Sequence, residues 1–290
     1  MPAYWIDSFA GTDIGATATN TQLNGKKYIV PGKARSIVGL RPKTYSITST
    51  VDESLLASLA VLSSDLGLGP YEIFAPPVGS NLGTNVSVSN DEASWYPANF
   101  ACGGGEQVDF EGYLEIAHTS HAWMGLDILL SDSVGAAMPG SLSQWSNILD
   151  LSKPVQAKIG GIAEGAGPTT QTTAATPYAD GGTPIGGGNK YIKALYGVNV
   201  DTTPTASEPV SGLFQIFETG LSVNPLAFYS ETPGAGLLGT TTASQVAHIT
   251  KIEGLNVFLK TSAKPIGKYT PDVTLGTGGK FEVGYLYQDE

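Results

Sequence analysis

The side chains best suited to metal binding or acid–base chemistry are three histidines, two of which lie close together at His118 and His121. On a strand, residues three positions apart point to opposite faces, so these two imidazoles reach one metal ion only if a turn separates them. Asp127 would complete such a site through a hairpin. Histidines that are partly buried or at the rim of the fold explain this spacing better, and we expect no metal site.

The sequence also contains no pattern that is typical of nucleophilic catalysis. Cys102 is the single cysteine and precedes a run of glycines at 103–105, but a lone cysteine in a glycine-rich turn is usually inert. There is no Gly-x-Ser-x-Gly elbow, no calcium-binding loop and no phosphate-binding loop. The sequence does not exclude a pair of carboxylates that face a groove, as in glycoside hydrolases. We therefore expect a protein that is not an enzyme and that has no catalytic residues, no cofactor and no metal.

The composition excludes several other classes. Hydrophobic residues make up 41% of the 290 residues and charged residues only 14%, against about 25% in globular chains, so disorder driven by charge is excluded. The formal net charge of −11 argues against wrapping duplex nucleic acid or binding an anionic membrane. The one basic cluster is Lys26, Lys27, Lys33 and Arg35, which is either a small contact patch or a solvated turn.

Short β-branched or aromatic segments bounded by Gly and Pro dominate the chain and predict many short strands. The clearest examples are 36–40, 71–74, 192–200, 213–217 and 281–287. This pattern is typical of a β-sandwich or barrel and not of alternating β and α elements. Only 55–62 and 141–149 have helix-like patterns, each of about two turns.

A Gly-, Pro- and Thr-rich segment around residues 160–189 interrupts this pattern near the middle of the chain. Long segments of this kind are functional loops or domain boundaries. We therefore expect four parts: an N-terminal arm over 1–32, a first β-barrel domain over 33–150, a linker or loop over 151–189 and a second β domain over 190–290.

The two sides of this linker resemble each other in sequence. Lys33–Leu40 matches Lys190–Val198, and 69–74 matches 224–229. Glu111–Ser120 matches Glu253–Ser262, with Glu-Gly and Thr-Ser at the same spacing in both. Short matches of common residues arise by chance, but three in the same order favour an internal duplication of a β domain. The size of the repeat suits a sandwich or jelly-roll barrel.

These features together resemble the jelly-roll major capsid proteins of membrane-containing icosahedral viruses. The closest likeness is the larger capsid protein of phages that infect thermophilic bacteria. The opening segment Tyr4–Phe9 and the all-β pattern with Gly/Pro/Thr-rich loops carry the likeness, which covers the whole chain loosely without a diagnostic motif. The resemblance implies a subunit of a virion shell that binds copies of itself and other capsid subunits. It implies no catalytic residues.

Two other classes fit the sequence: a carbohydrate-binding or carbohydrate-cleaving β-sandwich, and a surface-layer or adhesin subunit. The four tryptophans, Trp5, Trp95, Trp123 and Trp145, are scattered, as expected for core or interface anchors and not for a sugar platform. The amino terminus lacks the basic and apolar regions of a signal peptide. We therefore expect synthesis in the host cytoplasm, assembly into a virion, and contact with any internal membrane or genome mainly through other proteins.

Overall fold

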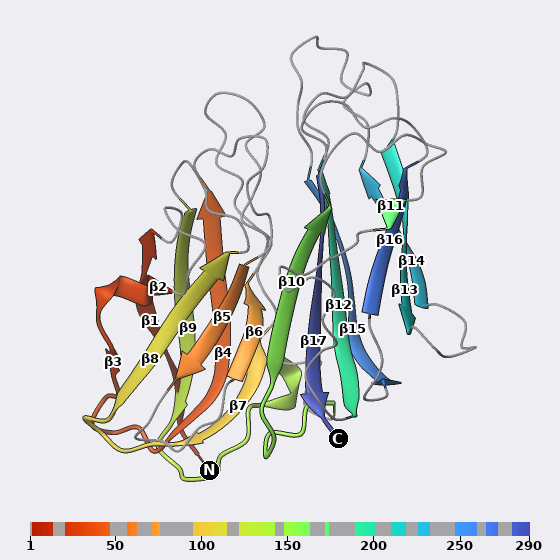
Figure 1. Cartoon of the computed structure of the whole chain (residues 1–290). Helices are drawn as coiled ribbons and strands as arrows, with labels where there is room; N and C mark the ends of the chain where they lie inside the picture. Colours follow the sequence, from red (N-terminus) through yellow and green to blue (C-terminus); the bar gives the residue numbers. More distant parts are fainter. Residues whose placement is uncertain are drawn as a thin grey trace.

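The computed structural model contains two β-sandwiches that stand side by side, with most strands of both running in similar directions (Figure 1). It describes residues 2–13, 21–46, 57–62, 71–75, 95–114, 122–142, 148–162, 172–173, 189–200, 210–218, 226–232, 247–259, 265–271 and 280–290. In these residues the helical segments are two 3-10 turns, η1 (Leu23–Gly25) and η2 (Gly140–Leu142). None of the helices in them is long and apolar enough to cross a membrane. The prediction of an all-β sandwich fold is confirmed.

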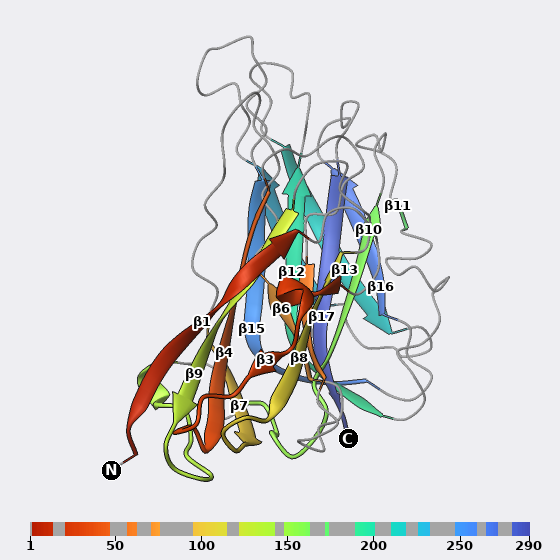
Figure 2. The same cartoon turned by 90° about the vertical axis from the view of Figure 1, so that its left-hand side faces the viewer.

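The first sandwich contains two antiparallel sheets. One has the order β1-β9-β4-β7, formed by β1 (Tyr4–Asp13), β9 (Ala122–Ser131), β4 (Ser36–Ser46) and β7 (Tyr96–Ala101). The other has the order β2-β8-β5-β6, formed by β2 (Thr21–Gln22), β8 (Gln107–Leu114), β5 (Ala57–Leu62) and β6 (Tyr71–Ala75). The short β3 (Tyr28–Ile29) also pairs with β8. Figure 2 shows β1 at the outer edge of this sandwich, near η1 and β3.

The second sandwich also contains two antiparallel sheets. One has the order β10-β17-β12-β15, formed by β10 (Gln156–Ile162), β17 (Lys280–Asp289), β12 (Lys190–Val200) and β15 (Ala247–Leu259). The other has the order β11-β16-β13-β14, formed by β11 (Thr172–Thr173), β16 (Pro265–Pro271), β13 (Val210–Glu218) and β14 (Leu226–Thr232). The two sheets meet where β14 contacts β12 and β15.

The two sandwiches have the same strand order. Strands β2 and β3 pair with successive parts of β8 on either side of η1, so they act as one interrupted strand. With that pair counted once, the described part of each sandwich has eight strands along the chain. In both, one sheet joins the first, eighth, third and sixth strands, and the other joins the second, seventh, fourth and fifth.

The core of the first sandwich follows from the alternation of side chains along its strands. On β9, Met124, Leu126, Ile128 and Leu130 point inward and are buried. They meet Leu59, Val61, Ile73 and Phe110 from the opposite sheet in one cluster of apolar side chains. Burial of this apolar area is the main force that holds the two sheets together.

The same apolar cluster continues into the second sandwich through β6. Tyr71 and Ile73 point into the first core, whereas Phe74 lies against β17, where Gly284 leaves room for its ring. A Cβ placed on Gly284 would lie 2.5 Å from Cζ of Phe74. Val155, Ala194 and Leu286 of the second sandwich belong to the same cluster. The two sandwiches therefore share a core.

Backbone contacts reinforce this junction at the edges of two sheets. Tyr71 of β6 forms a parallel bridge with Val155, just before β10, and the amide of Glu72 donates to the carbonyl of Val155 at 2.7 Å. The carboxylate of Glu72 accepts a hydrogen bond of 2.8 Å from the amide of Ala157. Here a side chain takes the place of a backbone carbonyl, so the pairing does not extend into a regular ladder.

The structure differs from the predicted domain boundaries in two segments. Residues 1–32 were expected to form an arm, but β1 pairs with β9 over its length and Phe9 is buried in the core. Residues 151–189 were expected to form a linker or loop, but β10 and β11 are strands of the second sandwich. Glycine-rich composition hides β10, because its run Lys158–Ile162 obtains its position from pairing with β17 and not from its own propensity.

The helix expected over 55–62 is wrong in its described part, because Ala57–Leu62 is strand β5, paired on both sides. A short apolar run fits a buried strand as well as a helix, and tertiary pairing decides between them. Of the helix expected over 141–149, the structure shows a single 3-10 turn over Gly140–Leu142, and residues 143–147 lie outside the described residues.

The sequence repeat can be compared with the strand order. Lys33–Leu40 and Lys190–Val198 contribute to β4 and β12, the third strands of their sandwiches. The segments after Pro70 and Pro225 form β6 and β14, the fifth strands. The third match fails, because Glu111 lies on a seventh strand, β8, and Glu253 on a sixth strand, β15. Two of the three matches thus join strands in corresponding positions.

We predict that Gly284→Ala lowers the free energy of unfolding by about 1–3 kcal/mol, because the added methyl group forces the Phe74 ring out of its place. Urea unfolding of the full chain measures the effect. Combining Gly284→Ala with Phe74→Leu should cost less than the sum of the two single changes, since the shorter side chain makes room.

Gly140→Ala is the matched control for this substitution, because nothing lies within 4 Å of the Cβ it would add. It should leave the free energy of unfolding nearly unchanged. Additive single and double changes at positions 284 and 74 would contradict direct packing of Phe74 on Gly284.

Candidate functional site: the outer face of the first sheet

The most highly organised group of charges in the described residues lies on the outer face of sheet β1-β9-β4-β7. The alternation that turns Leu126 and Ile128 inward on β9 turns Asp127 outward between them. The strand register places Ser8 of β1 on one side of Asp127 and Arg41 of β4 on the other. Lys43, two residues further along β4, points to the same face.

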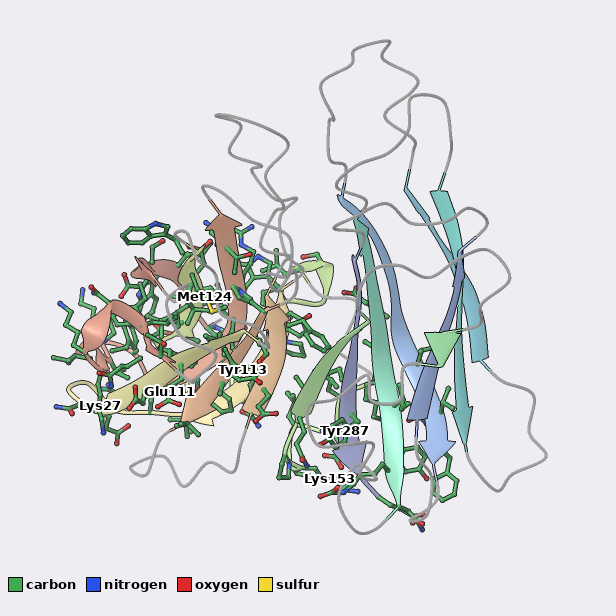
Figure 3. The ribbon with its side chains drawn as sticks, turned by 45° about the horizontal axis from the view of Figure 1, so that its top comes forward. Lys27, Glu111, Tyr113, Met124, Lys153 and Tyr287 are labelled. Atoms are coloured by element: carbon green, nitrogen blue, oxygen red, sulfur yellow. The ribbon has the colours of Figure 1, made fainter. Side chains whose placement is uncertain are left out.

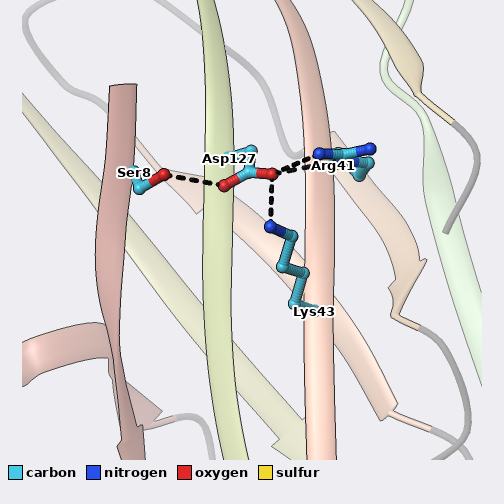
Figure 4. Close-up of polar contacts among 4 residues, drawn as sticks. All are labelled: Ser8, Arg41, Lys43 and Asp127. Atoms are coloured by element: carbon cyan, nitrogen blue, oxygen red, sulfur yellow. Dashed lines mark hydrogen bonds and ion pairs between the residues drawn. The ribbon is translucent and has the colours of Figure 1, made fainter. Parts of the chain in front are cut away.

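Asp127 accepts hydrogen bonds or ion pairs from all three of these neighbours (Figure 4). The hydroxyl of Ser8 donates to Oδ1 at 2.9 Å. Arg41 donates to Oδ2 from Nε at 3.1 Å and from Nη2 at 2.7 Å, and Nζ of Lys43 lies 2.6 Å from the same oxygen. The Asp127 side chain is only 5% exposed, so solvent screens its pairing with Arg41 weakly.

Burial alone would raise the pKa of Asp127, because it removes water from the charged carboxylate. Hydrogen bonds from Lys43, Arg41 and Ser8 outweigh this effect and hold the pKa below its usual value. Asp127 is therefore a carboxylate at neutral pH with its charge neutralised by two cations. Such a group is suited to a structural role and not to accepting a proton from a substrate.

Arg41 connects this cluster to an apolar patch on the same face. Its guanidinium lies over the ring of Trp95, 4.9 Å from the ring centre. Trp95 in turn belongs to a small cluster with Val38, Leu129, Ala136 and Met138. The segment after β9 thus folds back over the sheet and covers part of its outer face.

Hydrogen bonds fix this covering segment to the strands beneath it. The hydroxyl of Ser36 donates to the carbonyl of Ser133 at 2.8 Å and accepts from the amide of Gly135 at 3.2 Å. The hydroxyl of Tyr4 donates to the carbonyl of Ala137 at 3.0 Å. The outer face is therefore a fixed surface built from β1, β9, β4 and residues 132–142.

Apolar side chains remain exposed on this surface. Ile6 on β1 is 54% exposed, and Val134 on the covering segment is 74% exposed. Tyr4 keeps part of its ring in solvent as well. We call Tyr4, Ile6 and Val134 the β1 apolar group. Together with the neutralised Asp127, these side chains make this face suitable for contact with another protein surface.

Of the residues considered for a histidine metal site, only Asp127 lies in the described part of the chain. His118 and His121 lie outside the described residues, and the side chain of His248 does too. Asp127 is engaged by cations and not placed in a metal-ligand set. The described part of the chain contains no group of three or more His, Cys, Asp or Glu side chains that could hold a metal ion.

Cys102 is buried, and this burial raises the pKa of its thiol to about 11, with a further contribution from Glu106. Its glycine-rich turn is held by hydrogen bonds, including one from the Gly103 amide to the Glu106 carboxylate at 2.6 Å. The thiol is therefore protonated at neutral pH, unlike an activated nucleophile.

The basic cluster expected from the sequence is divided between two turns. Lys26 and Lys27 follow η1 and are exposed, and Lys33 lies exposed in the turn before β4. Arg35 uses its guanidinium locally, donating to the carbonyls of Ala34 at 2.8 Å and Gly32 at 3.2 Å. The guanidinium thus helps to hold its own turn together.

The sequence alone does not predict the Asp127 cluster as a group. Its signal was a single acid within the apolar run Leu126–Leu130, together with two cations spaced by two residues on β4. Pairing Arg41 with Asp127 requires the register between β4 and β9, which the sequence does not give.

No protein-family model and no curated protein matches the chain. Among solved structures it is similar to the PBSX exported protein XepA, with 13% identity and a TM-score of 0.26 over 98% of this chain and 86% of that one. It is also similar to the CBM22-1-CBM22-2 tandem domain of Xyn10C from Paenibacillus barcinonensis, with 10% identity and a TM-score of 0.21 over 98% and 97%. It is also similar to the structure of the Macrobrachium rosenbergii nodavirus, with 7% identity and a TM-score of 0.21 over 99% of this chain and 97% of that one. TM-scores this low support no conclusion about function.

We predict that Asp127→Asn lowers the free energy of unfolding by about 2 kcal/mol at neutral pH, because the charge-assisted hydrogen bonds from Arg41 and Lys43 are lost. Since folding lowers the pKa of Asp127, its stabilisation is present above the unfolded pKa of about 4 and is lost as the pH falls through the folded value. Denaturant unfolding at several pH values should show the difference between the two proteins closing in acid.

Asp132→Asn serves as the control on the same face, because Asp132 is exposed just after β9. Its effect at neutral pH should be much smaller. A constant difference between Asp127→Asn and the unchanged protein at all pH values would contradict the electrostatic explanation.

For Cys102 we predict very slow reaction with a thiol reagent in the folded protein, because the thiol is buried and has a pKa of about 11. A colorimetric thiol assay should detect one group only after denaturant is added. Rapid modification of the folded chain at neutral pH would disprove this assignment.

Proposed function

We propose that the chain is a structural subunit of an icosahedral virus capsid and acts by self-association. The observation that supports this proposal most is the strand order, first-eighth-third-sixth opposite second-seventh-fourth-fifth, found in both sandwiches. It is the order in which a chain forms a jelly roll of eight strands, the architecture used by viral capsid and lectin domains. On this interpretation the chain is a duplicated jelly roll, in agreement with the two sequence matches on corresponding strands.

The junction between the sandwiches also suits a shell subunit. Separate domains joined by a flexible linker would present their contact surfaces at varying angles. Here the shared core at Phe74 and the backbone contacts of Glu72 join the two sandwiches. A subunit of this kind presents surfaces in a fixed relation to one another, as a closed shell requires.

In this proposal, the outer face of the first sheet is the contact surface for a neighbouring subunit. Interfaces are depleted in charged residues at their centre and use aromatic and aliphatic anchors. The β1 apolar group lies beside an acid that is already neutralised within its own chain, so burial of this face leaves no unpaired Asp127 charge. Association through such a face depends mainly on apolar burial and should persist in added salt.

A carbohydrate-binding β-sandwich is the alternative class, since lectin domains also use jelly rolls. A sugar platform needs aromatic faces open to solvent. Trp95 is buried under Arg41, and Trp5 and Trp123 are half-buried. These three tryptophans therefore support anchoring within the fold more than stacking on a sugar.

We predict that the full chain forms oligomers or shell-like assemblies at high concentration and that Ile6→Lys weakens them while leaving the fold intact. The added charge would have to be desolvated at the contact. Sedimentation velocity and electron microscopy measure assembly, and circular dichroism verifies the fold.

Ile29→Lys is the matched control, because Ile29 is 62% exposed and pairs with β8 in the opposite sheet of the first sandwich. It should leave assembly through the outer face unchanged. Equal effects of the two substitutions would reject this face as the contact. A chain that stays monomeric at all concentrations, alone and with other capsid subunits, and binds glycans would overturn the capsid proposal in favour of a lectin.

A further inference from the structure

A buried lysine in the second sandwich is in direct contact with an asparagine on the neighbouring strand. Lys193 lies on β12 and is only 7% exposed. The pairing of β12 with both of its neighbours shifts between Ile192 and Ala194, so Lys193 occupies a bulge. A bulge turns a side chain away from the direction that regular alternation would give it.

The asparagine is brought to this lysine by an irregularity on the other strand. Asn256 lies on β15, two residues after Gly254, whose φ of +81° is a conformation that glycine adopts readily. Nζ of Lys193 donates a hydrogen bond to Oδ1 of Asn256 at 2.7 Å. The amine and the side-chain amide are therefore held together by two paired strands, as reacting groups must be.

The surroundings lower the pKa of the Lys193 amine. Burial lowers the pKa of Lys193, and the charge of Lys153 lowers it further, whereas Asp150 acts in the opposite direction. The Tyr191 ring, whose centre lies 5.3 Å from Nζ, also favours the charged form. A desolvated lysine with a lowered pKa is the form in which lysine acts as a nucleophile.

Nearby groups also provide a carboxylate at a fixed position. Asp150 precedes β10, and its amide donates to Oε1 of Gln288 at 3.0 Å while Nε2 of Gln288 donates back to its carbonyl at 2.8 Å. Lys153 and Tyr287, next to Gln288 on β17, lie at the same end of the sandwich (Figure 3). The charge of Asp150 acts on the Lys193 amine from this end of the sandwich, and the exposed Asn256 leaves a path for a small product.

We propose that Lys193 and Asn256 form an intramolecular isopeptide bond in the folded protein. After the ammonium loses one proton to water, Nζ attacks Cγ of Asn256. The Nζ–Cγ bond forms, the Cγ–Nδ2 bond breaks, and Nδ2 takes a proton from Nζ and leaves as ammonia. No oxidant, reductant or cofactor is required, because one amide replaces another.

The bond would join β12 to β15 across a separation of 63 residues in sequence. A covalent link of this kind restricts the unfolded chain much as a disulfide does. It would not depend on the redox state of the compartment, whereas Cys102 is the chain's single cysteine and cannot form an internal disulfide.

The test is the mass of the intact, denatured full chain after the folded protein has been incubated at mildly alkaline pH. The bond lowers the mass by one molecule of ammonia, and protease digestion releases the Lys193 and Asn256 peptides as one branched species. Lys193→Arg keeps the positive charge, and Asn256→Ala removes the amide. Each variant should have its full calculated mass.

Full mass for the unchanged, folded chain, with both peptides recovered separately, would overturn the proposal. So would a loss of ammonia that persists in Asn256→Ala, because the loss would then come from another residue. Circular dichroism checks the fold of each variant. If Asn256→Ala fails to fold, Asn256→Gln replaces it, because its longer side chain should also prevent the reaction.

Discussion

The contact of Phe74 with Gly284 is the constraint on which the arrangement of the two sandwiches depends. One face of strand β6 is buried in the core of the first sandwich, so only side chains on its other face can contact the second sandwich. Phe74 lies on this other face, and the absence of a side chain at Gly284 lets its ring lie against β17. The apolar cluster then runs from one sandwich into the next, so the two halves share part of one core.

The charged groups on the outer face of the first sheet likewise depend on a contact between strands that are distant in sequence. The sequence from residue 44 to residue 152 has many acids but no lysine or arginine, so the cations for Asp127 come from β4, which begins before this stretch. Strand β4 is therefore both a central strand of the sheet and the supplier of Arg41 and Lys43. A buried acid without these partners would be costly, which ties the register of β4 and β9 to a specific pair of residues.

Local pattern was sufficient to predict the all-β class and strands such as β6, β12, β13 and β17, because each has β-branched or aromatic residues between Gly or Pro. It failed for β5, whose run Ala57–Leu62 suits helix and buried strand equally, and for β10, whose glycines have little propensity of their own. The charged cluster at Asp127 and the contact of Lys193 with Asn256 could not be predicted, because both depend on register between strands distant in sequence. Bulges such as the one at Lys193 shift that register without an obvious sequence signal.

The parallel bridge between Tyr71 and Val155 has a consequence for the solubility of each half. Strands β6 and β10 lie at the edges of their sheets, where unpaired amides and carbonyls invite pairing with other chains. In the intact chain each edge shields the other, and the Glu72 carboxylate on the Ala157 amide ends the pairing after a single step. A half of the molecule produced alone would expose such an edge together with either Phe74 or the surface of β17 at Gly284. Its expected fate is aggregation, so the tandem protects itself against the polymerisation that strand edges otherwise promote.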